Sequence, residues 1–325
     1  MEGLVLFNKP QNYTSVQIVN YFKKLTKKKV GHGGTLDPFA EGLLILGIDD
    51  YTKELTKFLK ESRKTYIAEI ELGAISDTYD ITGNIVRTDA NPEPRRVQDH
   101  EPSSALVHGL TRTDTNLNIS EIEKILAGFI GEIEQIPPPY SAIKIKGKRA
   151  YKLARKGLKV DLKPRKVKIY NIKILDLKEK ILKIEVEVSS GTYIRSLAHD
   201  IGQKLGCGAY LKSLVRTKIN EFTLEEALSF EDIEKDYLEF YVKVYGRVQR
   251  VGFRLFCRNW AQNLGIFGYA KNLTDGSIEV LAQGKEKNLQ EFLEKIKRGP
   301  ILAKVEKIEI IWRKAKNRFS YFETF

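Results

Sequence analysis

The run Gly31-His32-Gly33-Gly34-Thr35-Leu36-Asp37-Pro38 places one carboxylate in a turn that is bounded by proline and surrounded by small residues. Glycine allows backbone geometries that other residues resist, and Pro38 biases the residues before it toward extended conformations. An aspartate held in this way can act as a nucleophile. The same residues also fit a turn in which Asp37 caps a helix over residues 40–46. Spacing alone leaves both interpretations open.

Patterns on either side of this run predict a mixture of strands and helices, so the expected fold class is α+β. Apolar or alternating residues predict strands at residues 3–7, 66–72 and 240–244, and two more within 163–188 on either side of 176–180. Helical spacing predicts a helix over residues 16–24 that Ser15 caps, and a turn into a helix over residues 191–205.

Residues 89–118 have no sustained periodicity and combine prolines with many polar side chains. A segment of this kind and length predicts a flexible insertion, and its two histidines, His100 and His108, are not expected to be catalytic. Regular structure is expected to resume at Ser120, whose spacing to Glu123 fits a capping box for the helix that follows.

The composition is that of a globular protein with about two domains, because 42% of the 325 residues are hydrophobic and 30% are charged. No apolar run is long enough to span a bilayer, and no signal peptide is evident at the N-terminus, so a cytoplasmic protein with no membrane partner is expected. Two cysteines and four histidines show no metal-ligand spacing, which predicts no metal. A monomer is the default expectation.

The positive charge is concentrated near the C-terminus. The whole chain carries 55 Lys and Arg against 42 Asp and Glu, and residues 240–325 alone carry 17 against 8, which leaves 38 against 34 for residues 1–239. The last quarter therefore holds +9 of the net +13. This balance favours a polyanionic partner such as RNA, although a solvated surface can also be basic.

Further motifs stand in a fixed order along the chain: Asn8-Lys9-Pro10 with Thr14-Ser15, residues 32–42, Lys64-Thr65-Tyr66 with Leu72-Gly73 and Asp77-Thr78-Tyr79-Asp80, residues 136–142, Gly191-Thr192-Tyr193-Ile194-Arg195-Ser196-Leu197, and Gly206-Cys207-Gly208-Ala209 with residues 211–217. Several unlike motifs in order are more specific than any one of them. Together they resemble the TruB family of tRNA pseudouridine synthases over residues 1–235. The insertion at 89–118 departs from that family's usual pattern.

The resemblance implies a mixed-sheet catalytic domain over residues 1–238 that isomerises uridine 55 in the T loop of tRNA. The reaction breaks the C1′–N1 bond and joins C5 to the same sugar without a redox change, so no cofactor is expected. The resemblance implies that Asp37 is the nucleophile or base, and that Tyr66 stacks on the flipped base and removes the C5 proton. It implies that Arg195 pairs with Asp37.

The same resemblance implies four further substrate-site residues. His32 would enter the RNA loop at the place the base has left. Tyr193 and Leu214 would line the pocket, with plain core packing as an open alternative for both. Lys9 would support the active-site loop.

TruB proteins usually carry an RNA-binding PUA module after this point, and none is found here. Residues 245–254 (Tyr-Gly-Arg-Val-Gln-Arg-Val-Gly-Phe-Arg), with Lys271-Asn272, Asp275-Gly276-Ser277 and Gly299-Pro300, resemble acylphosphatase. The resemblance implies a ferredoxin-like sandwich over residues 239–325, in which Arg254 clamps a phosphate and Asn272 positions the attacking water.

Two departures bear on this second site. Arg250 stands where the family usually has glycine, at a position that could require a positive φ, and Tyr269 stands where tryptophan is common. The C-terminal domain is therefore expected either to hydrolyse acyl phosphates or to bind tRNA phosphates in place of the missing module. The alternative for the whole chain is an RNA-binding or RNA-folding protein whose main catalytic activity is acyl phosphate hydrolysis.

Overall fold

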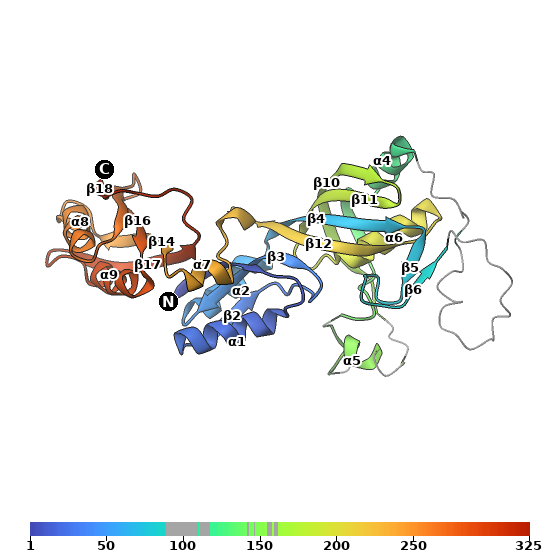
Figure 1. Cartoon of the computed structure of the whole chain (residues 1–325), viewed down its shortest axis with the longest axis horizontal. Helices are drawn as coiled ribbons and strands as arrows, with labels where there is room; N and C mark the ends of the chain where they lie inside the picture. The colour runs from blue at the N-terminus through green and yellow to red at the C-terminus, as the bar shows by residue number, and fades with distance from the viewer. Residues whose placement is uncertain (89–109, 111–117, 142, 146, 155–157, 159–161) are drawn as a thin grey trace. The chain divides into compact units, whose positions relative to one another are not determined.

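The computed structural model describes residues 1–88, 110, 118–141, 143–145, 147–154, 158 and 162–325 (Figure 1). Contacts divide the chain into two compact units, Met1–Lys60 with Glu221–Phe325, and Glu61–Asn220. Within the described residues, no helix is both long enough and apolar enough to cross a membrane.

The first unit is built on a mixed sheet. In chain order its elements are β1 Gly3–Lys9, α1 Ser15–Thr26, β2 Val30–Gly33, β3 Glu41–Ile48, α2 Tyr51–Lys60, β13 Phe222–Thr223, the 3-10 helix η1 Leu224–Glu226, α7 Phe230–Glu234, β14 Leu238–Arg247, α8 Phe253–Asn263, β15 Phe267–Asn272, β16 Ile278–Gly284, α9 Glu286–Arg298, β17 Lys304–Arg313 and β18 Phe322–Thr324. Its strands lie in the order β18-β15-β16-β14-β17-β1-β3, and β2 also pairs with β3.

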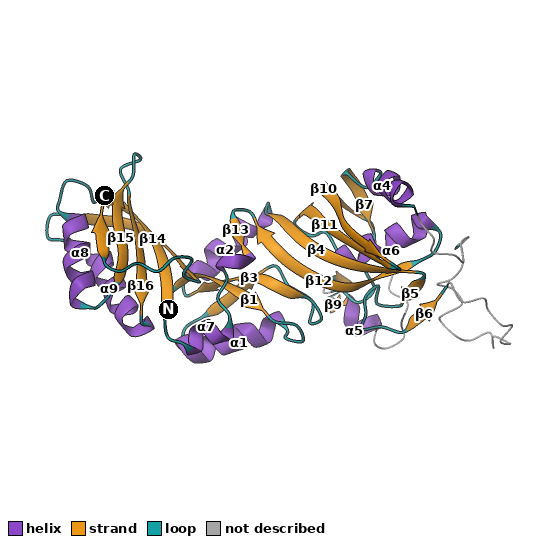
Figure 2. Ribbon diagram, turned by 45° about the horizontal axis from the view of Figure 1, so that its top comes forward, coloured by secondary structure: helices purple, strands orange, loops and turns teal. Residues whose placement is uncertain are grey.

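Residues 238–313 confirm the predicted order of strand, helix, hairpin, helix and strand. The spatial order β15-β16-β14-β17 is that of a ferredoxin-like sheet, and all three of its pairings are antiparallel. Helices α8 and α9 contact each other and lie on one side of this sheet (Figure 2). Their buried side chains, among them Phe253, Phe292 and Ile296, belong to the same core cluster as Val242 and Val280 of the strands.

Strand β1 extends this sheet by pairing in parallel with β17, with Leu4 opposite Ile311 and Val5 opposite Trp312. Gly3 makes the close approach feasible, because its φ is 107° and a Cβ there would lie 2.7 Å from the Ile310 carbonyl oxygen. The pairing covers the edge of β17, which would otherwise expose unpaired backbone groups. One continuous core cluster runs from Val5 and Phe7 to the strands and helices of the C-terminal module.

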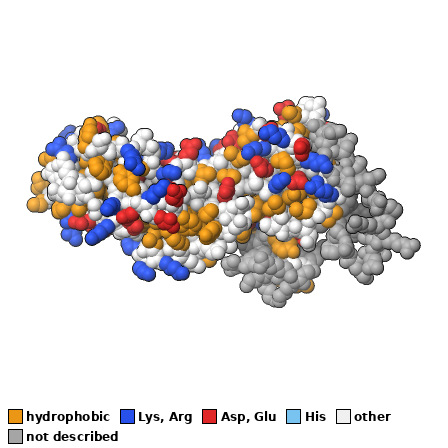
Figure 3. Space-filling model, in the orientation of Figure 1, with side chains coloured by type: hydrophobic (Ala, Val, Ile, Leu, Met, Phe, Trp, Pro, Cys, Tyr) orange, Lys and Arg blue, Asp and Glu red, His pale blue; other side chains and the backbone are white. Residues whose placement is uncertain are grey.

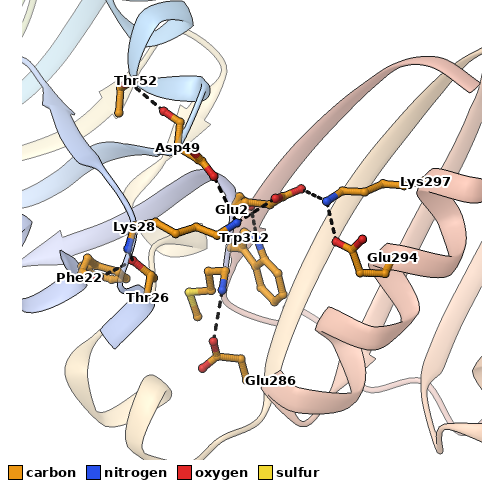
Figure 4. A network of polar contacts seen from close by, with 11 residues as sticks. Glu2, Phe22, Thr26, Lys28, Asp49, Thr52, Glu286, Glu294, Lys297 and Trp312 are labelled. Carbon is orange, nitrogen blue, oxygen red and sulfur yellow. Dashed lines mark hydrogen bonds and ion pairs between the residues drawn. The ribbon is translucent and has the colours of Figure 1, made fainter. Parts of the chain in front are cut away.

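Polar contacts around Glu2 reinforce this pairing (Figure 4). The Glu2 carboxylate pairs with Lys28 at 3.1 Å and with Lys297, and the Glu2 carbonyl accepts a 2.7 Å hydrogen bond from Trp312 Nε1. The N-terminal amine of Met1 lies 3.5 Å from Glu286. The boundary predicted at residues 238 and 239 falls inside this unit, so the two predicted domains share a core there.

The second unit is also built on a sheet, with strands in the order β12-β4-β11-β10-β7 and antiparallel pairing from β12 through β7. Its elements are β4 Arg63–Leu72, β5 Ala74–Ser76, β6 Ile85–Arg87, α4 Ile119–Ala127, β7 Gly131–Gln135, β8 Lys144–Ile145, β9 Lys148–Arg149, α5 Ala150–Ala154, β10 Arg165–Lys178, β11 Ile181–Ser189, α6 Ile194–Leu205 and β12 Ala209–Ile219. The predicted strands at 66–72 and within 163–188, and the helix leading to Leu205, are confirmed.

Several local predictions were wrong. The helix suggested for residues 40–46 is strand β3, and helix α2 was not predicted. The cap of α1 is Thr14, whose hydroxyl accepts from the Gln17 amide, while Ser15 begins the helix. The cap of α4 is Asn118, so the capping box expected at Ser120 does not form. The predicted insertion at 89–118, with His100 and His108, lies almost entirely outside the described residues.

Candidate functional site

Asp37 lies in a turn between β2 and β3 that is anchored from both sides. The buried side chains of Leu36 and Phe39 flank it, and the Asp37 carbonyl accepts a 3.1 Å hydrogen bond from the Ala40 amide. The Ser15 hydroxyl lies 3.1 Å from the Leu36 amide nitrogen and 3.3 Å from the Leu36 carbonyl oxygen. The turn therefore holds a half-buried carboxylate at a fixed place, and no helix follows it to be capped.

Lys9 is the buried cation beneath this turn. Its side chain has no exposed surface, and its ammonium donates to the carbonyls of Pro10 at 2.9 Å, Tyr13 at 2.7 Å and Pro38 at 3.5 Å. These contacts tie the segment after β1 to the turn that holds Asp37, and a role of Lys9 in supporting the active-site loop stays a prediction. His32 lies on β2, half-buried, with its backbone opposite Leu46 of β3.

Tyr66 lies in the second unit on strand β4, between β12 and β11, and its side chain is 7% exposed. Its neighbours in register are Val186 on β11 and Arg216 on β12. Leu214 is buried on β12 opposite Ala68. Tyr66 and Leu214 are therefore brought onto adjacent strands, whereas Asp37 and His32 belong to the first unit.

Two buried cations beside Tyr66, Lys64 and Arg216, were not predicted. Lys64 precedes it by two residues, so both side chains lie on the same face of β4. The Lys64 ammonium donates to Ser190 at 3.2 Å, and burial, together with the charge of Arg216, lowers the pKa of Lys64 to about 8. Lys64 was quoted only as part of the Lys64-Thr65-Tyr66 motif, and nothing in the sequence signals its burial.

Arg195 is the second residue of helix α6, and its side chain is buried against the segment that follows β5. Its guanidinium pairs with Asp80 at 3.2 Å and donates to the carbonyls of Thr78 at 3.3 Å and Tyr140 at 3.2 Å. Tyr193 lies just before the helix, and its backbone exchanges two hydrogen bonds with the Gln135 side chain, of 2.8 and 3.0 Å.

Asp80 is the acidic partner of Arg195 that sequence reasoning missed. Its carboxylate accepts from the Thr78 hydroxyl at 2.8 Å and from the Thr82 amide and hydroxyl at 2.9 and 2.5 Å. The pairing of Arg195 with Asp37 stays a prediction, because the two residues belong to different units. Asp80 lies in the motif Asp77-Thr78-Tyr79-Asp80, which contributed to the family resemblance, but no separate role was predicted for it.

A second cluster of perturbed groups surrounds Tyr79, whose φ is 64°. Its ring stacks on His199 with centroids 4.0 Å apart and planes 8° apart. Burial lowers the pKa of His199 to about 4 and raises the pKa of Asp200 to about 6, against a lowering effect of Lys204 on Asp200. His199 is therefore neutral at physiological pH. Asp200 is ionised there, and its burial makes the ionised form less favourable than it would be in water.

Replacing Asp200 with asparagine is expected to raise the free energy of unfolding by about 2–3 kcal/mol at about pH 7, at about 1.4 kcal/mol per pKa unit. The pKa of the Asp200 carboxyl is about 6 in the folded protein, against an ordinary value of 3.8. Between these two pH values the folded protein keeps a proton that the unfolded chain has lost. Stability therefore falls as the pH rises through this window, and the penalty is complete above it. Urea unfolding at about pH 4 should show almost no gain. An equal gain at both pH values, or the same gain for Asp176→Asn at an exposed carboxylate, would contradict this origin.

The residues expected to form the phosphate site of the C-terminal module lie together. A pocket of about 230 Å³ is lined by Val248, Arg250, Gly252, Phe253, Arg254, Leu255, Asn272, Ile278 and Thr324. It lies where Gly252, with φ 77°, precedes the first turn of α8. The free amides of such a turn favour an anion. The guanidinium of Arg254 donates to the Phe325 carbonyl, and the buried Asn272 Oδ1 has no hydrogen-bond partner among the described residues.

The loop of this pocket is held by Gln249, whose side-chain amide donates to the carbonyls of Leu273 and Ser277, each at 2.8 Å. Arg250, at the tip, has φ 58°. The expectation that this position requires a positive φ is therefore confirmed, and the arginine adopts it. Among the described residues, no group of three or more His, Cys, Asp and Glu is arranged to hold a metal.

Comparison with known families agrees with both resemblances. The family model "TruB family pseudouridylate synthase (N terminal domain)" matches residues 23–107 and 101–194. The model "tRNA pseudouridylate synthase B C-terminal domain" matches residues 195–243, and the acylphosphatase model matches residues 240–324.

Curated relatives cover the same part of the chain. The tRNA pseudouridine synthase B of Aquifex aeolicus is 43% identical over 235 residues, which are 71% of this chain and 73% of the relative. That of Clostridium tetani is 40% identical over 243 residues, 74% and 76% of the two chains. A solved Cbf5-Nop10-Gar1 complex contains a chain with the same fold, with a TM-score of 0.51 and 22% identity over 94% of this chain and 84% of that chain.

Proposed function

Because the chain belongs to the TruB family of pseudouridylate synthases, we propose that it converts uridine 55 in the T loop of tRNA to pseudouridine. The observation that supports this most directly is the turn at Asp37, which fixes one carboxylate in place with buried flanking residues and with Lys9 beneath it. Asp37 acts as the catalytic aspartate in the cleavage of the C1′–N1 bond. N1 is released, the uracil turns, and C5 joins the sugar before it loses its proton.

The second unit supplies the groups that receive the flipped base. Tyr66 stacks on the base, which offsets the few kcal/mol required to unstack it, and takes part in removing the C5 proton. Lys64 and Arg216 flank Tyr66, so the platform is electropositive and suits a group linked to phosphates. Arg195 organises the site through its contacts with Asp80, Thr78 and Tyr140. Leu214 and Tyr193 complete the pocket, and His32 enters the RNA loop.

The test is pseudouridine formation in an unmodified tRNA transcript by the intact chain, mapped by chemical probing and compared with an Asp37 variant. A chain shortened to end near residue 239 would not isolate the contribution of the C-terminal module, because its loss would also disturb the rest of the first unit. Removing β17 would expose the edge of β1 and open the core that both parts of the first unit share.

For the C-terminal module we propose acyl phosphate hydrolysis. Arg254 and the amides of the first turn of α8 hold the phosphoryl group, and Asn272 Oδ1 accepts a hydrogen bond from the attacking water. Water attacks phosphorus, the bond from phosphorus to the acyl oxygen breaks, and a carboxylate and inorganic phosphate leave. Asn272 Oδ1 supports this assignment, because a buried acceptor that has no partner within the described part of the chain needs a donor.

Replacing Arg254 and Asn272 together with alanine is expected to lower acetyl phosphate turnover at least about 100-fold, because the clamp and the water acceptor are both removed. The matched control is Arg258→Ala with Asn263→Ala, the same residue types on exposed positions of α8. Released phosphate measures turnover. Unchanged turnover in the first variant would refute the hydrolase.

The other role for this module is binding of RNA phosphates. Among the described residues on the face drawn in Figure 3, Lys and Arg side chains lie among acidic and apolar ones and form no continuous basic patch. Loss of tRNA affinity in the Arg254 and Asn272 variant, with no loss in the control, would favour the RNA role over hydrolysis.

A further inference from the structure

Arg250 is the residue of this pocket that the acylphosphatase resemblance does not explain. Its φ of 58° is one that side chains adopt at an energetic disadvantage. Other residues of the chain with positive φ include short polar ones such as Asn12 and Asp49, which tolerate this region, and long ones such as Lys27 and Glu179. Positive φ alone therefore does not distinguish Arg250, whose position in the lining of the pocket does.

The side chain of Arg250 is available for a ligand. The residue is exposed, it lines the pocket with Arg254 and Asn272, and it has no hydrogen bond or ion pair within the described part of the chain. The loop does not depend on it, because the neighbouring Gln249 fastens the loop to the β15–β16 hairpin. Of the described residues that line the pocket, two are arginines and none is acidic.

We propose that Arg250 is a second cationic contact for the phosphoryl group, and that it makes the pocket favour phosphates with two negative charges over singly charged phosphodiesters. The proposal rests on the phosphate site proposed above for this module. A guanidinium that faces a doubly charged group gains about twice the Coulomb energy that it gains from a singly charged one. Because of this difference in Coulomb energy, the pocket should bind a terminal phosphoryl group more tightly than a phosphodiester of the kind found in RNA.

The experiment measures binding of two probes to the intact chain, inorganic phosphate at a pH where it is mostly doubly charged and dimethyl phosphate, which carries one charge. The Gly252 amide, followed by NMR in protein labelled at glycine, reports binding at the pocket. In Arg250→Gly and Arg250→Asn, the dissociation constant for inorganic phosphate is expected to rise about tenfold, and that for dimethyl phosphate about threefold. Both replacements accept positive φ, so neither strains the loop.

Two controls separate this proposal from its premise. Arg250→Lys should restore most of the affinity, and Arg258→Ala, which removes an exposed charge of α8 outside the pocket, should leave it unchanged. If Arg254→Ala abolishes phosphate binding while Arg250→Gly and Arg250→Asn stay within twofold of the intact chain, the role of Arg250 is refuted and the phosphate site stands. If Arg258→Ala weakens binding as much as Arg250→Gly does, the effect is one of net charge and the proposal fails. If Arg254→Ala also binds normally, the proposed site itself is refuted.

Discussion

Replacing Asp37 with asparagine is expected to abolish pseudouridine formation, by at least about 10³-fold, while tRNA affinity changes by no more than about threefold. Asparagine keeps the shape of the side chain but lacks the charge needed for attack or for proton removal. The turn should remain folded, because Ser15, Lys9 and the buried side chains of Leu36 and Phe39 anchor it. Product mapped at position 55 measures activity, and fluorescence anisotropy of labelled tRNA measures affinity.

The matched control is Asp49→Asn in the same unit. Asp49 is half exposed, it follows β3, and its carboxylate pairs with Lys28 at 3.3 Å. Its φ of 65° is one that asparagine accepts. Full activity in Asp49→Asn and none in Asp37→Asn would identify the catalytic aspartate. Retained activity in Asp37→Asn would remove Asp37 from the reaction, and absence of product from the intact chain would favour the RNA-binding reading with acyl phosphate hydrolysis as the main activity.

Elements whose buried residues recur with a regular spacing could be predicted from the sequence. A short run in which every residue is apolar could not be assigned to strand or helix. Strand β4 alternates, with Tyr66, Ala68 and Ile70 buried on one face, so its period of two is visible in the sequence. Strand β3 reads Glu-Gly-Leu-Leu-Ile-Leu-Gly-Ile and is buried at every position after the first. A run that is buried on both faces has no alternation, so strand and helix are indistinguishable by period.

Tertiary pairing explains what the sequence concealed at the candidate sites. Asp37, Tyr66, Arg254 and Asn272 stood in recognisable motifs. The partnership of Arg195 with Asp80 depends on how helix α6 packs against the segment after β5, and no local rule encodes that packing. The parallel pairing of β1 with β17 joins strands about 300 residues apart, and its only local trace is Gly3.

Replacing Asp80 with asparagine is expected to lower the free energy of unfolding of the second unit by about 3–5 kcal/mol, because it removes the carboxylate that pairs with the buried Arg195 guanidinium. The side chains of Arg195 and Asp80 are 6% and 3% exposed. Solvent can therefore do little to compensate the remaining charge. Arg195→Met removes the charge itself, so adding it to Asp80→Asn should cause much less further loss than Arg195→Met causes alone. Denaturant unfolding of the two single variants and the double variant gives a coupling of at least about 2 kcal/mol in this account.

The pair of Lys183 with Glu69 is the matched comparison in the same unit. Its atoms are also 3.1 Å apart, but its side chains are 40% and 33% exposed. Lys183→Met, Glu69→Gln and the double variant should show a coupling below about 1 kcal/mol, since water screens the pair. Additive losses for Arg195 and Asp80 would mean that the guanidinium is compensated by its other contacts. Arg195 would then be held in place mainly by the carbonyls of Thr78 and Tyr140, and Asp80 would serve chiefly to order the turn through Thr78 and Thr82.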